Sequence, residues 1–339
     1  MRQPVSAFGD IHHLFYKSYL PNIVNVAIDA GVFEALSAKA MSAASLSEKL
    51  KTDQVITQAL LEVLTAADYL HKKYTQYELT LIAKEYLTEA SELNQLRLIK
   101  RYAVDAGPFK NLLTALKGDI EEFEQKQWSN EEAIIEIEQG AKAGAIQDMI
   151  AFAEKMPEFH TATKMCDLAG NSGYYAFASL NENPNLMAHV YDLEAVCEIA
   201  KKIKKQEPNF NRITYHACDI QNDSFGNDYD LFFISHFLYK YAATNQLVDV
   251  LKKVNRSMKM GGLFISQHMT NDYDLDCSLT LTIVELMTCS MGYPTHFLPE
   301  NTFKEALNQA GFGQFKVQAP DERLAYPSFL LKAIKEREI

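Results

Sequence analysis

The sequence has few cysteines, a single tryptophan and no apolar run long enough to cross a membrane. Its five cysteines are scattered without C-x-x-C spacing, which indicates free thiols in a reducing compartment. The N-terminus lacks the basic-then-apolar pattern of a signal peptide. These absences predict a soluble, cytoplasmic protein.

Basic residues are also in deficit. Lys and Arg number 33 against 44 Asp and Glu, so the net charge is −11. This acidic excess argues against binding nucleic acid or an anionic membrane through the overall field. The hydrophobic fraction of 47% and the charged fraction of 23% are ordinary for a globular protein. The length predicts two domains, each with its own core.

The stretch 164–194 organises the rest of the chain. A strand, a glycine turn, a helix and a second strand are predicted in succession at Met165–Ala169, Gly170–Gly173, Tyr174–Leu180 and Ala188–Tyr191. Glycine permits the turn because it adopts positive φ without a Cβ clash. Asp192 follows the second strand, about 20 residues beyond the glycines, where a carboxylate accepts hydrogen bonds from ribose hydroxyls. The pattern predicts a nucleoside-binding βαβ unit.

A second carboxylate discriminates between nucleoside ligands. The turn reads D-L-A-G-N-S-G, with Asp167 before the glycines, rather than the G-x-G-x-x-G of dinucleotide sites. An acid at this position would repel a pyrophosphate, but it suits a cationic ligand. We therefore favour S-adenosylmethionine, which carries a sulfonium and an ammonium group, over NAD. The simpler alternative is a βαβ turn that binds no ligand.

The N-terminal region has the pattern of a winged helix. We expect a helix over residues 11–36, a serine-capped helix opening at 45–48, and another starting at Thr52 and Asp53. Two short strands follow, around Leu70 and at 77–80.

DNA binding is the first function that a winged helix suggests. The expected recognition helix, 52–67, contains Asp53 and Glu62 but no Lys or Arg. A helix that enters the major groove normally brings cations to phosphates and base edges. We therefore expect a structural, dimer-forming role for this region.

Alternating helices and strands continue to the C-terminus, which predicts a parallel sheet covered on both faces. The expected strands are 213–217, 229–235, 263–267, 315–319 and 329–334, with a turn at Gly261-Gly262 before the third. The expected helices are 195–205, 245–258, 278–291 and 300–310.

Five sequence blocks occur in the order of a known family: DLAGNSGYYA, VYDLEAV, HACDI, DLFFISHFLYKY and MKMGGLFISQHM. With the N-terminal region, nearly the whole chain resembles the S-adenosylmethionine-dependent O-methyltransferases of the plant caffeate and bacterial small-molecule type. The resemblance implies a Rossmann-like, doubly wound α/β sheet preceded by a mainly α-helical winged-helix dimerisation domain. It implies a dimerisation domain at 1–100, a helical connector that helps build the substrate pocket at 101–160, and a cofactor-binding catalytic domain at 161–339. It also implies a homodimer that acts on a small molecule.

The resemblance assigns the cofactor site residue by residue. Asp167 and Gly170 would lie against the methionyl part of the cofactor, Asp192 would hold the ribose diol, and Asp219 would hold the adenine amine. The complete expected set is Asp167, Gly170, Gly173, Asp192, Leu193, Asp219, Ile220, Ser235 and Tyr241.

The catalytic positions depart from the family pattern. The family's proton acceptor is the histidine of a His-Asp-Trp triplet, and this chain has Tyr239-Lys240-Tyr241 there. The glutamates that orient that histidine are also missing, with His268 near one expected position and Phe297 near the other. Either another group removes the acceptor's proton, or proximity to the sulfonium suffices, and N-, S- or C-methylation stays open.

We expect His236, His268 and Tyr239 to be the catalytic candidates. His236 directly follows the buried strand YDLFFIS and His268 ends the next strand, so both lie at the carboxyl edge of the sheet. Histidine is a plausible base because its ordinary pKa is near 6.5, although either could be structural. Tyr239, with an ordinary pKa near 10, suits substrate contact better.

Substrate contacts are expected from Met287, Met291 and His296. The two methionines lie one helical turn apart, where relatives sandwich a flat acceptor, although methionine more often fills a core. His216 and Cys218 lack further ligands, so we expect no metal site. The sequence thus predicts methyl transfer by direct displacement to a small planar or aromatic metabolite. The alternative from another class is a ligand-sensing winged-helix regulator.

Overall fold

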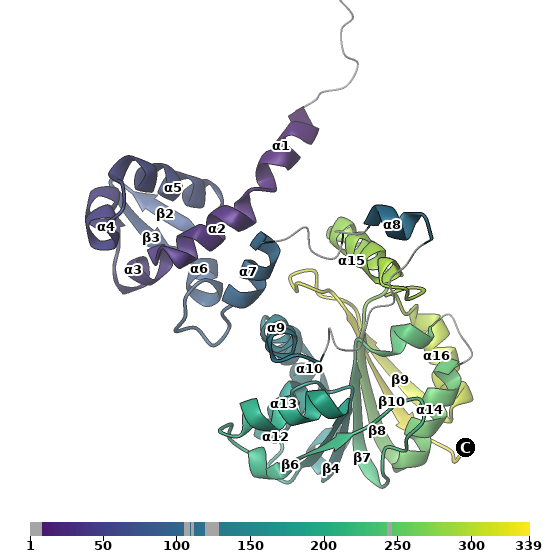
Figure 1. The fold of residues 1–339 in the computed structure, drawn as a ribbon. Helices are drawn as coiled ribbons and strands as arrows, with labels where there is room; N and C mark the ends of the chain where they lie inside the picture. The colour runs from purple at the N-terminus through teal and green to yellow at the C-terminus, as the bar shows by residue number, and fades with distance from the viewer. Residues whose placement is uncertain (1–8, 105–108, 110–111, 119–128, 243–245) are drawn as a thin grey trace, which may run out of the picture. The chain divides into compact units, whose positions relative to one another are not determined.

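The computed structural model describes residues 9–104, 109, 112–118, 129–242 and 246–339 (Figure 1). The chain divides into two compact units, Met1–Lys110 and Asn111–Ile339, which are considered separately. Residues 119–128 of the expected connector lie outside the described residues. No helix in the described part of the chain has the length and apolarity needed to cross a membrane.

The N-terminal unit begins with three helices, so the expectation of one helix over 11–36 was wrong. They are α1 (Gly9–Lys17), α2 (Leu20–Asp29) and α3 (Val32–Ala38). Pro21 lies in the first turn of α2, where it lacks only an N–H that would be unpaired anyway. Gly31, with φ of 77°, precedes α3 and separates it from α2.

The rest of this unit combines short helices with a small sheet. The remaining elements are β1 (Met41–Ser42), α4 (Ala43–Leu50), α5 (Gln54–Ala66), β2 (Leu70–Lys73), β3 (Gln76–Leu79), α6 (Leu81–Tyr86) and α7 (Leu96–Val104). Helix α5 starts where expected, and Asp53 caps it by accepting from the N–H groups of Val55 and Ile56. Ser42, not the expected Ser45, caps α4.

The C-terminal unit contains a seven-stranded sheet of order β6-β5-β4-β7-β8-β10-β9. The strands are β4 (Lys164–Leu168), β5 (Met187–Asp192), β6 (Ile213–Ala217), β7 (Tyr229–Ser235), β8 (Met258–His268), β9 (Phe312–Gln318) and β10 (Phe329–Lys335). Neighbours from β6 to β8 pair in parallel, and β10 pairs antiparallel with β8 and β9. This confirms the predicted Rossmann-like, mostly parallel sheet, which follows a helical N-terminal unit in the sequence.

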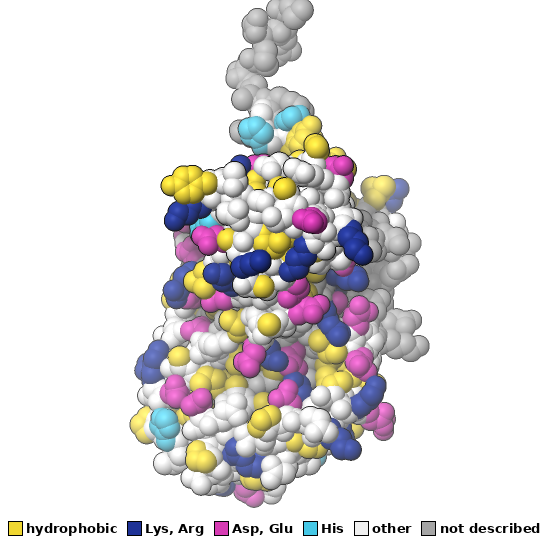
Figure 2. Space-filling view, turned by 90° about the vertical axis from the view of Figure 1, so that its left-hand side faces the viewer, with side chains coloured by type: hydrophobic (Ala, Val, Ile, Leu, Met, Phe, Trp, Pro, Cys, Tyr) yellow, Lys and Arg dark blue, Asp and Glu magenta, His cyan; other side chains and the backbone are white. Residues whose placement is uncertain are grey.

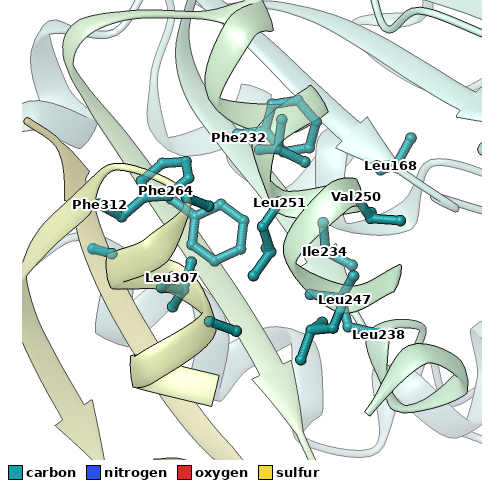
Figure 3. Close-up of a cluster of buried hydrophobic side chains, with 14 of the residues drawn as sticks. Leu168, Phe232, Ile234, Leu238, Leu247, Val250, Leu251, Phe264, Leu307 and Phe312 are labelled. Atoms are coloured by element: carbon teal, nitrogen blue, oxygen red, sulfur yellow. The ribbon is translucent and has the colours of Figure 1, made fainter. Parts of the chain in front are cut away.

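Helices cover both faces of this sheet (Figure 1). The helices of this unit are α8 (Leu112–Leu116), α9 (Glu131–Lys142), α10 (Ala145–Ala153), α11 (Pro157–Thr161), α12 (Tyr174–Glu182), α13 (Glu194–Lys204), α14 (Gln246–Ser257), α15 (Ser278–Ser290) and α16 (Glu300–Gln309). Short 3-10 helices lie at Phe210–Arg212 and at η4 (Leu238–Tyr241). On one face α14 and α16 pack on strand residues such as Phe232 and Phe264 (Figure 3). On the other, α10, α12 and α13 pack around Phe233 and Val190.

Strand β8 runs through Gly261 and Gly262, so the expected turn at these glycines was wrong. Gly261 has φ of 76°, and the β7–β8 register shifts between Tyr229 and Leu231. A Cβ on Gly262 would lie 2.9 Å from the Lys259 carbonyl oxygen. The two glycines therefore accommodate an irregularity within a strand.

Candidate functional site

The carboxyl ends of β4 and β5 lie side by side because the two strands pair in parallel, with Leu168 opposite Tyr191. Asp192, at the end of β5, joins the two loops that follow. Its Oδ2 accepts a hydrogen bond from the Asn171 N–H at 2.8 Å, and its Oδ1 accepts one from the Leu193 N–H at 2.8 Å. We call this region, from Asp167 to Gly173 with Asp192 and Leu193, the donor edge.

The turn after β4 is tight for two different reasons. Ala169, Asn171 and Gly173 have φ of 54°, 53° and 81°, which is a strained conformation for the first two. Gly170 does not have positive φ, contrary to the expectation. A Cβ there would lie 2.7 Å from Cγ of Asp167, so Gly170 is needed for close approach.

Asp167 is a buried carboxylate with unused hydrogen-bonding capacity. Its side chain is 1% exposed, and its Oδ2 has no hydrogen-bond partner among the described residues. Burial raises its pKa to about 8, although the Ala176 N–H opposes the shift and Asp192 adds to it. An unpaired buried oxygen under a glycine cradle fits a cationic ligand group.

The other expected cofactor residues differ in exposure. Asp219 is exposed, and its carboxylate accepts hydrogen bonds from the Gln221 N–H at 3.0 Å and the Asn222 side-chain amide at 2.7 Å. These bonds lower its pKa. Ile220 and Tyr241 are buried in the core beside α14. The residues that were expected to contact the adenine therefore make contacts within their own loop and core.

A second group of side chains gathers at the carboxyl ends of β7 and β8. His236 follows β7 with φ of 48°, an unusual conformation for a residue with a side chain. Its N–H donates to the Gln267 carbonyl oxygen at 2.9 Å, and its Nε2 lies 3.3 Å from Oγ of Ser328. Ser235 Oγ donates to Oε1 of Gln267 at 3.4 Å. Strained backbone thus follows β7 as it follows β4.

His236, His268 and His296 form a histidine cluster. Burial lowers the pKa of His236 to about 3 and that of His296 to about 4, and it also lowers the pKa of His268. The rings of His236 and His296 have centroids 6.2 Å apart. Tyr239 stacks on His296 at 4.2 Å. The cluster therefore consists of neutral imidazoles at neutral pH.

The members of the cluster are not equivalent. His268 is 1% exposed and packs against Phe303 and Phe329, with neither ring nitrogen hydrogen-bonded among the described residues. His236 and His296 are half-buried. The structure thus places His268 in the aromatic core and leaves the other two partly accessible.

Sequence reasoning missed two charged residues here. Glu285 on α15 accepts from Thr295 Oγ1 at 2.7 Å and from the His296 N–H at 2.6 Å, so it fixes a loop and not an imidazole ring. Lys240 is half-buried, with Nζ above the rings of Phe237 and Tyr293. Burial lowers its pKa, while Asp192 opposes the shift. The unusual Tyr239-Lys240-Tyr241 triplet was the signal for Lys240, and Glu285 had none. We call the histidine cluster with Tyr239 and Lys240 the acceptor edge.

The predicted substrate methionines lie on α15. Met287 is partly buried against a small cluster that includes Leu281 and Phe297, and Met291 follows the last turn of the helix. His296 accepts or donates through Nδ1 at 2.8 Å from Thr288 Oγ1. Met287 and His296 are thus anchored from the same helix.

His216 and Cys218, considered for a metal site, have other contacts. His216 stacks on Tyr191 and lies beside His189, with its Nε2 2.9 Å from His189 Nδ1, and Cys218 is buried in the core. Within the described ranges no group of three or more His, Cys, Asp or Glu side chains is arranged to hold a metal ion.

Comparison with known proteins adds evidence from sequence and fold. The model of the O-methyltransferase domain matches residues 123–313, and that of the O-methyltransferase dimerisation domain matches residues 12–89. An uncharacterized protein of Methanocaldococcus jannaschii is 27% identical over 270 residues, covering 76% of this chain and 69% of that protein. Acetylserotonin O-methyltransferase of Gallus gallus is 22% identical over 319 residues, covering 87% of this chain and 89% of that enzyme.

A solved structure shares the fold. Human N-acetylserotonin methyltransferase in complex with S-adenosylmethionine has a TM-score of 0.74 and 16% identity, covering 99% of this chain and 100% of that one. At this identity the likeness shows the architecture alone.

Proposed function

Because this chain belongs to the O-methyltransferase family, we propose that it methylates an oxygen of a small planar or aromatic metabolite. It is an S-adenosylmethionine-dependent methyltransferase. The observation that carries the proposed site is the donor edge, where Asp167 has an unpaired buried oxygen and Asp192 lies beside the same glycine turn. Family membership argues against the alternative of a ligand-sensing regulator.

The donor edge fits S-adenosylmethionine, which when bound supplies a methyl group for direct displacement from a sulfonium. Asp167 would face the cationic methionyl part, and Gly170 leaves room for it. Each Asp192 oxygen accepts one backbone N–H and retains capacity for a ribose hydroxyl. Gly173, Leu193, Asp219, Ile220, Ser235 and Tyr241 complete the proposed cofactor site.

At the acceptor edge, we assign mainly alignment and desolvation to the protein. His236 is the favoured group for holding the acceptor, because it is half-buried and follows β7 directly. Tyr239, Met287, Met291 and His296 would contact the acceptor's flat face. His268, in the aromatic core, would act through packing.

A second candidate reaction keeps the cofactor and changes the accepting atom. The histidine cluster has no carboxylate hydrogen-bonded to its rings among the described residues, and the pKa of His236 is about 3. A weak base suits an acceptor that is already nucleophilic, such as an amine, a thiolate or a carbanion. N-, S- or C-methylation therefore remains the alternative.

The assembly that we propose is a cytoplasmic homodimer. The chain carries a dimerisation domain, and its N-terminal unit exposes Phe15, Val55, Ile56 and Leu81. Acidic and basic side chains lie interspersed on the face shown in Figure 2, which gives no reason to propose nucleic acid as a partner.

The test is to incubate the purified protein with cell extract and S-adenosylmethionine labelled in its methyl group, and then to identify the product by mass spectrometry. We expect the label in a small planar metabolite, on oxygen. Label on nitrogen, sulfur or carbon would select the alternative. Binding of NAD without binding of S-adenosylmethionine would overturn both.

A further inference from the structure

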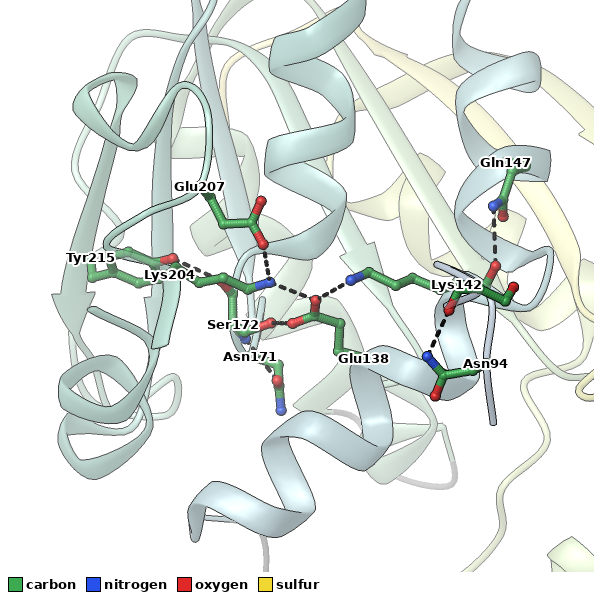
Figure 4. Close-up of polar contacts among 10 residues, drawn as sticks. Asn94, Glu138, Lys142, Gln147, Asn171, Ser172, Lys204, Glu207 and Tyr215 are labelled. Atoms are coloured by element: carbon green, nitrogen blue, oxygen red, sulfur yellow. Dashed lines mark hydrogen bonds and ion pairs between the residues drawn. The ribbon is translucent and has the colours of Figure 1, made fainter. Parts of the chain in front are cut away.

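A buried ion cluster lies next to the donor edge (Figure 4). Glu138 on α9 and Lys204 on α13 are each 6% exposed, with Oε1 and Nζ 2.5 Å apart. Lys142 also pairs with Oε1 at 2.7 Å. The other oxygen, Oε2, accepts a hydrogen bond from Ser172 Oγ at 2.5 Å. We call Glu138, Ser172 and Lys204 the Glu138 cluster.

Ser172 belongs to the glycine turn itself, so the cluster is joined to Asp192. The Ser172 N–H donates to Oδ1 of Asn171 at 2.7 Å, and the Asn171 N–H donates to Oδ2 of Asp192 at 2.8 Å. Tyr215 holds the turn from another direction, donating its hydroxyl to the Ser172 carbonyl oxygen at 2.7 Å. A continuous series of polar contacts therefore runs from Glu138 to Asp192.

Stability alone gives a weak reason for this arrangement. Burying an ion pair requires removing both charges from water, and an apolar pair of similar volume is often as stable. The cations hold the pKa of Glu138 below its usual value, although burial by itself would raise it. Glu138 is thus ionised when it accepts from Ser172, which makes that bond charge-assisted.

We propose that Glu138 is a positioning residue for the methyl donor. Through Ser172 it fixes the glycine turn, so that the Asn171 N–H keeps Asp192 in the orientation that accepts the ribose hydroxyls. The inference rests on the proposed function, since it requires Asp192 to hold the donor. It assigns to the helical segment before the sheet a role in donor affinity.

The same two helices offer a matched control. Glu131 on α9 pairs with Lys202 on α13 at 3.0 Å, but both side chains are exposed. A second control separates stability from positioning. Lys204→Gln removes a buried cation while leaving Glu138 paired with Lys142 and bonded to Ser172.

The experiment measures the affinity for S-adenosylhomocysteine by calorimetry and thermal stability by scanning fluorimetry, for the full chain. We expect Glu138→Gln to weaken donor affinity about tenfold or more, and Ser172→Ala to weaken it severalfold. Lys204→Gln should lower the melting temperature yet change affinity less than about threefold, and Glu131→Gln should change neither. Once the acceptor is known, the KM for the donor should rise while kcat at saturating donor stays within about twofold.

Two results would overturn the assignment in distinguishable ways. If wild-type protein binds neither S-adenosylmethionine nor S-adenosylhomocysteine, the proposed function itself fails. If wild type binds and Glu138→Gln and Ser172→Ala bind equally well, the positioning role alone fails. Should Glu138→Gln not fold, Ser172→Ala decides, because it removes only the hydroxyl. Equal affinity losses in Lys204→Gln and Ser172→Ala would indicate a general structural role.

Discussion

The donor edge and the acceptor edge lie on one sheet but are built from different chemistry. At the donor edge, a buried and a half-buried acid lie within one βαβ unit, and Asp192 accepts from the backbone N–H of Asn171. At the acceptor edge, neutral imidazoles and aromatic rings come from segments far apart in the chain, as with Tyr239 and His296. The first arrangement suits a fixed, charged ligand. The second arrangement is a largely uncharged surface that depends on how distant segments pack.

The largest effect that we expect is at the donor edge. Asp192→Ala removes the acceptor of two backbone hydrogen bonds and of the proposed bonds to ribose. Loss of charge-assisted hydrogen bonds worth about 1.5–3 kcal/mol each should weaken binding of S-adenosylhomocysteine by about 100-fold or more. Calorimetry measures this loss.

Asp219→Asn is the comparison for that variant. Asp219 is exposed and its carboxylate already bonds within its own turn, so we expect a loss nearer tenfold. Equal losses in the two variants would mean that burial does not set the strength of these contacts. Unchanged affinity in Asp192→Ala would remove Asp192 from the site.

A smaller effect, dependent on pH, is expected from Asp167. Its pKa is raised from 3.8 to about 8, so the carboxyl is protonated in the free protein at neutral pH. The associated stability is fully present below about pH 4 and is lost as pH rises through 8. A cationic donor favours the ionised form, so donor affinity should rise up to about tenfold per pH unit until pH 8, with proton release.

Calorimetry between pH 6 and 9, in buffers of different ionisation enthalpy, measures that proton release. Asp167→Asn should bind more weakly at pH 8 and lose the pH dependence, and its melting temperature should fall less between pH 5 and 8. An unchanged slope in the variant would assign the titration to another group. That group would not be His236 or His296, because their pKa values of about 3 and 4 lie far below this range.

The contrast between the edges also explains what the sequence could predict. The βαβ unit is local, so alternation and glycines located β4, α12 and β5, and placed Asp167 and Asp192 beside one turn. The predicted reason for Gly170, a positive φ, was wrong. A close approach between backbone and side chain cannot be recognised from the spacing of residues in a sequence. The start of α5 was predicted at its capping residue Asp53, whereas the start of α4 was placed too late because two serines, Ser42 and Ser45, lie close enough together for either to be the cap.

The acceptor edge could be predicted only as a list of candidate residues. His236 and His268 were placed at strand ends by the sheet pattern, but nothing in the sequence indicated that Phe303 and Phe329 enclose His268. The stacking of Tyr239 on His296 depends on how a loop returns from α15. Such contacts are set by packing between distant segments, which periodicity does not describe.

The smallest effect is therefore expected where family resemblance would predict the largest, at the acceptor edge. A general base contributes about 10²–10⁴-fold when its pKa lies near the working pH, but the pKa of His236 is about 3. His236→Gln should lower single-turnover rates less than about tenfold, with donor affinity unchanged. His268→Leu should leave the rate within about twofold and preserve or raise the melting temperature, because it removes two buried nitrogens without partners among the described residues. A loss of 100-fold or more in His236→Gln, together with a lost inflection in the pH–rate profile, would make His236 a true base. In that case, binding of donor and acceptor would have to raise the pKa of His236 toward neutrality. The acceptor edge, like the donor edge, would then depend on the charge of a titrating side chain.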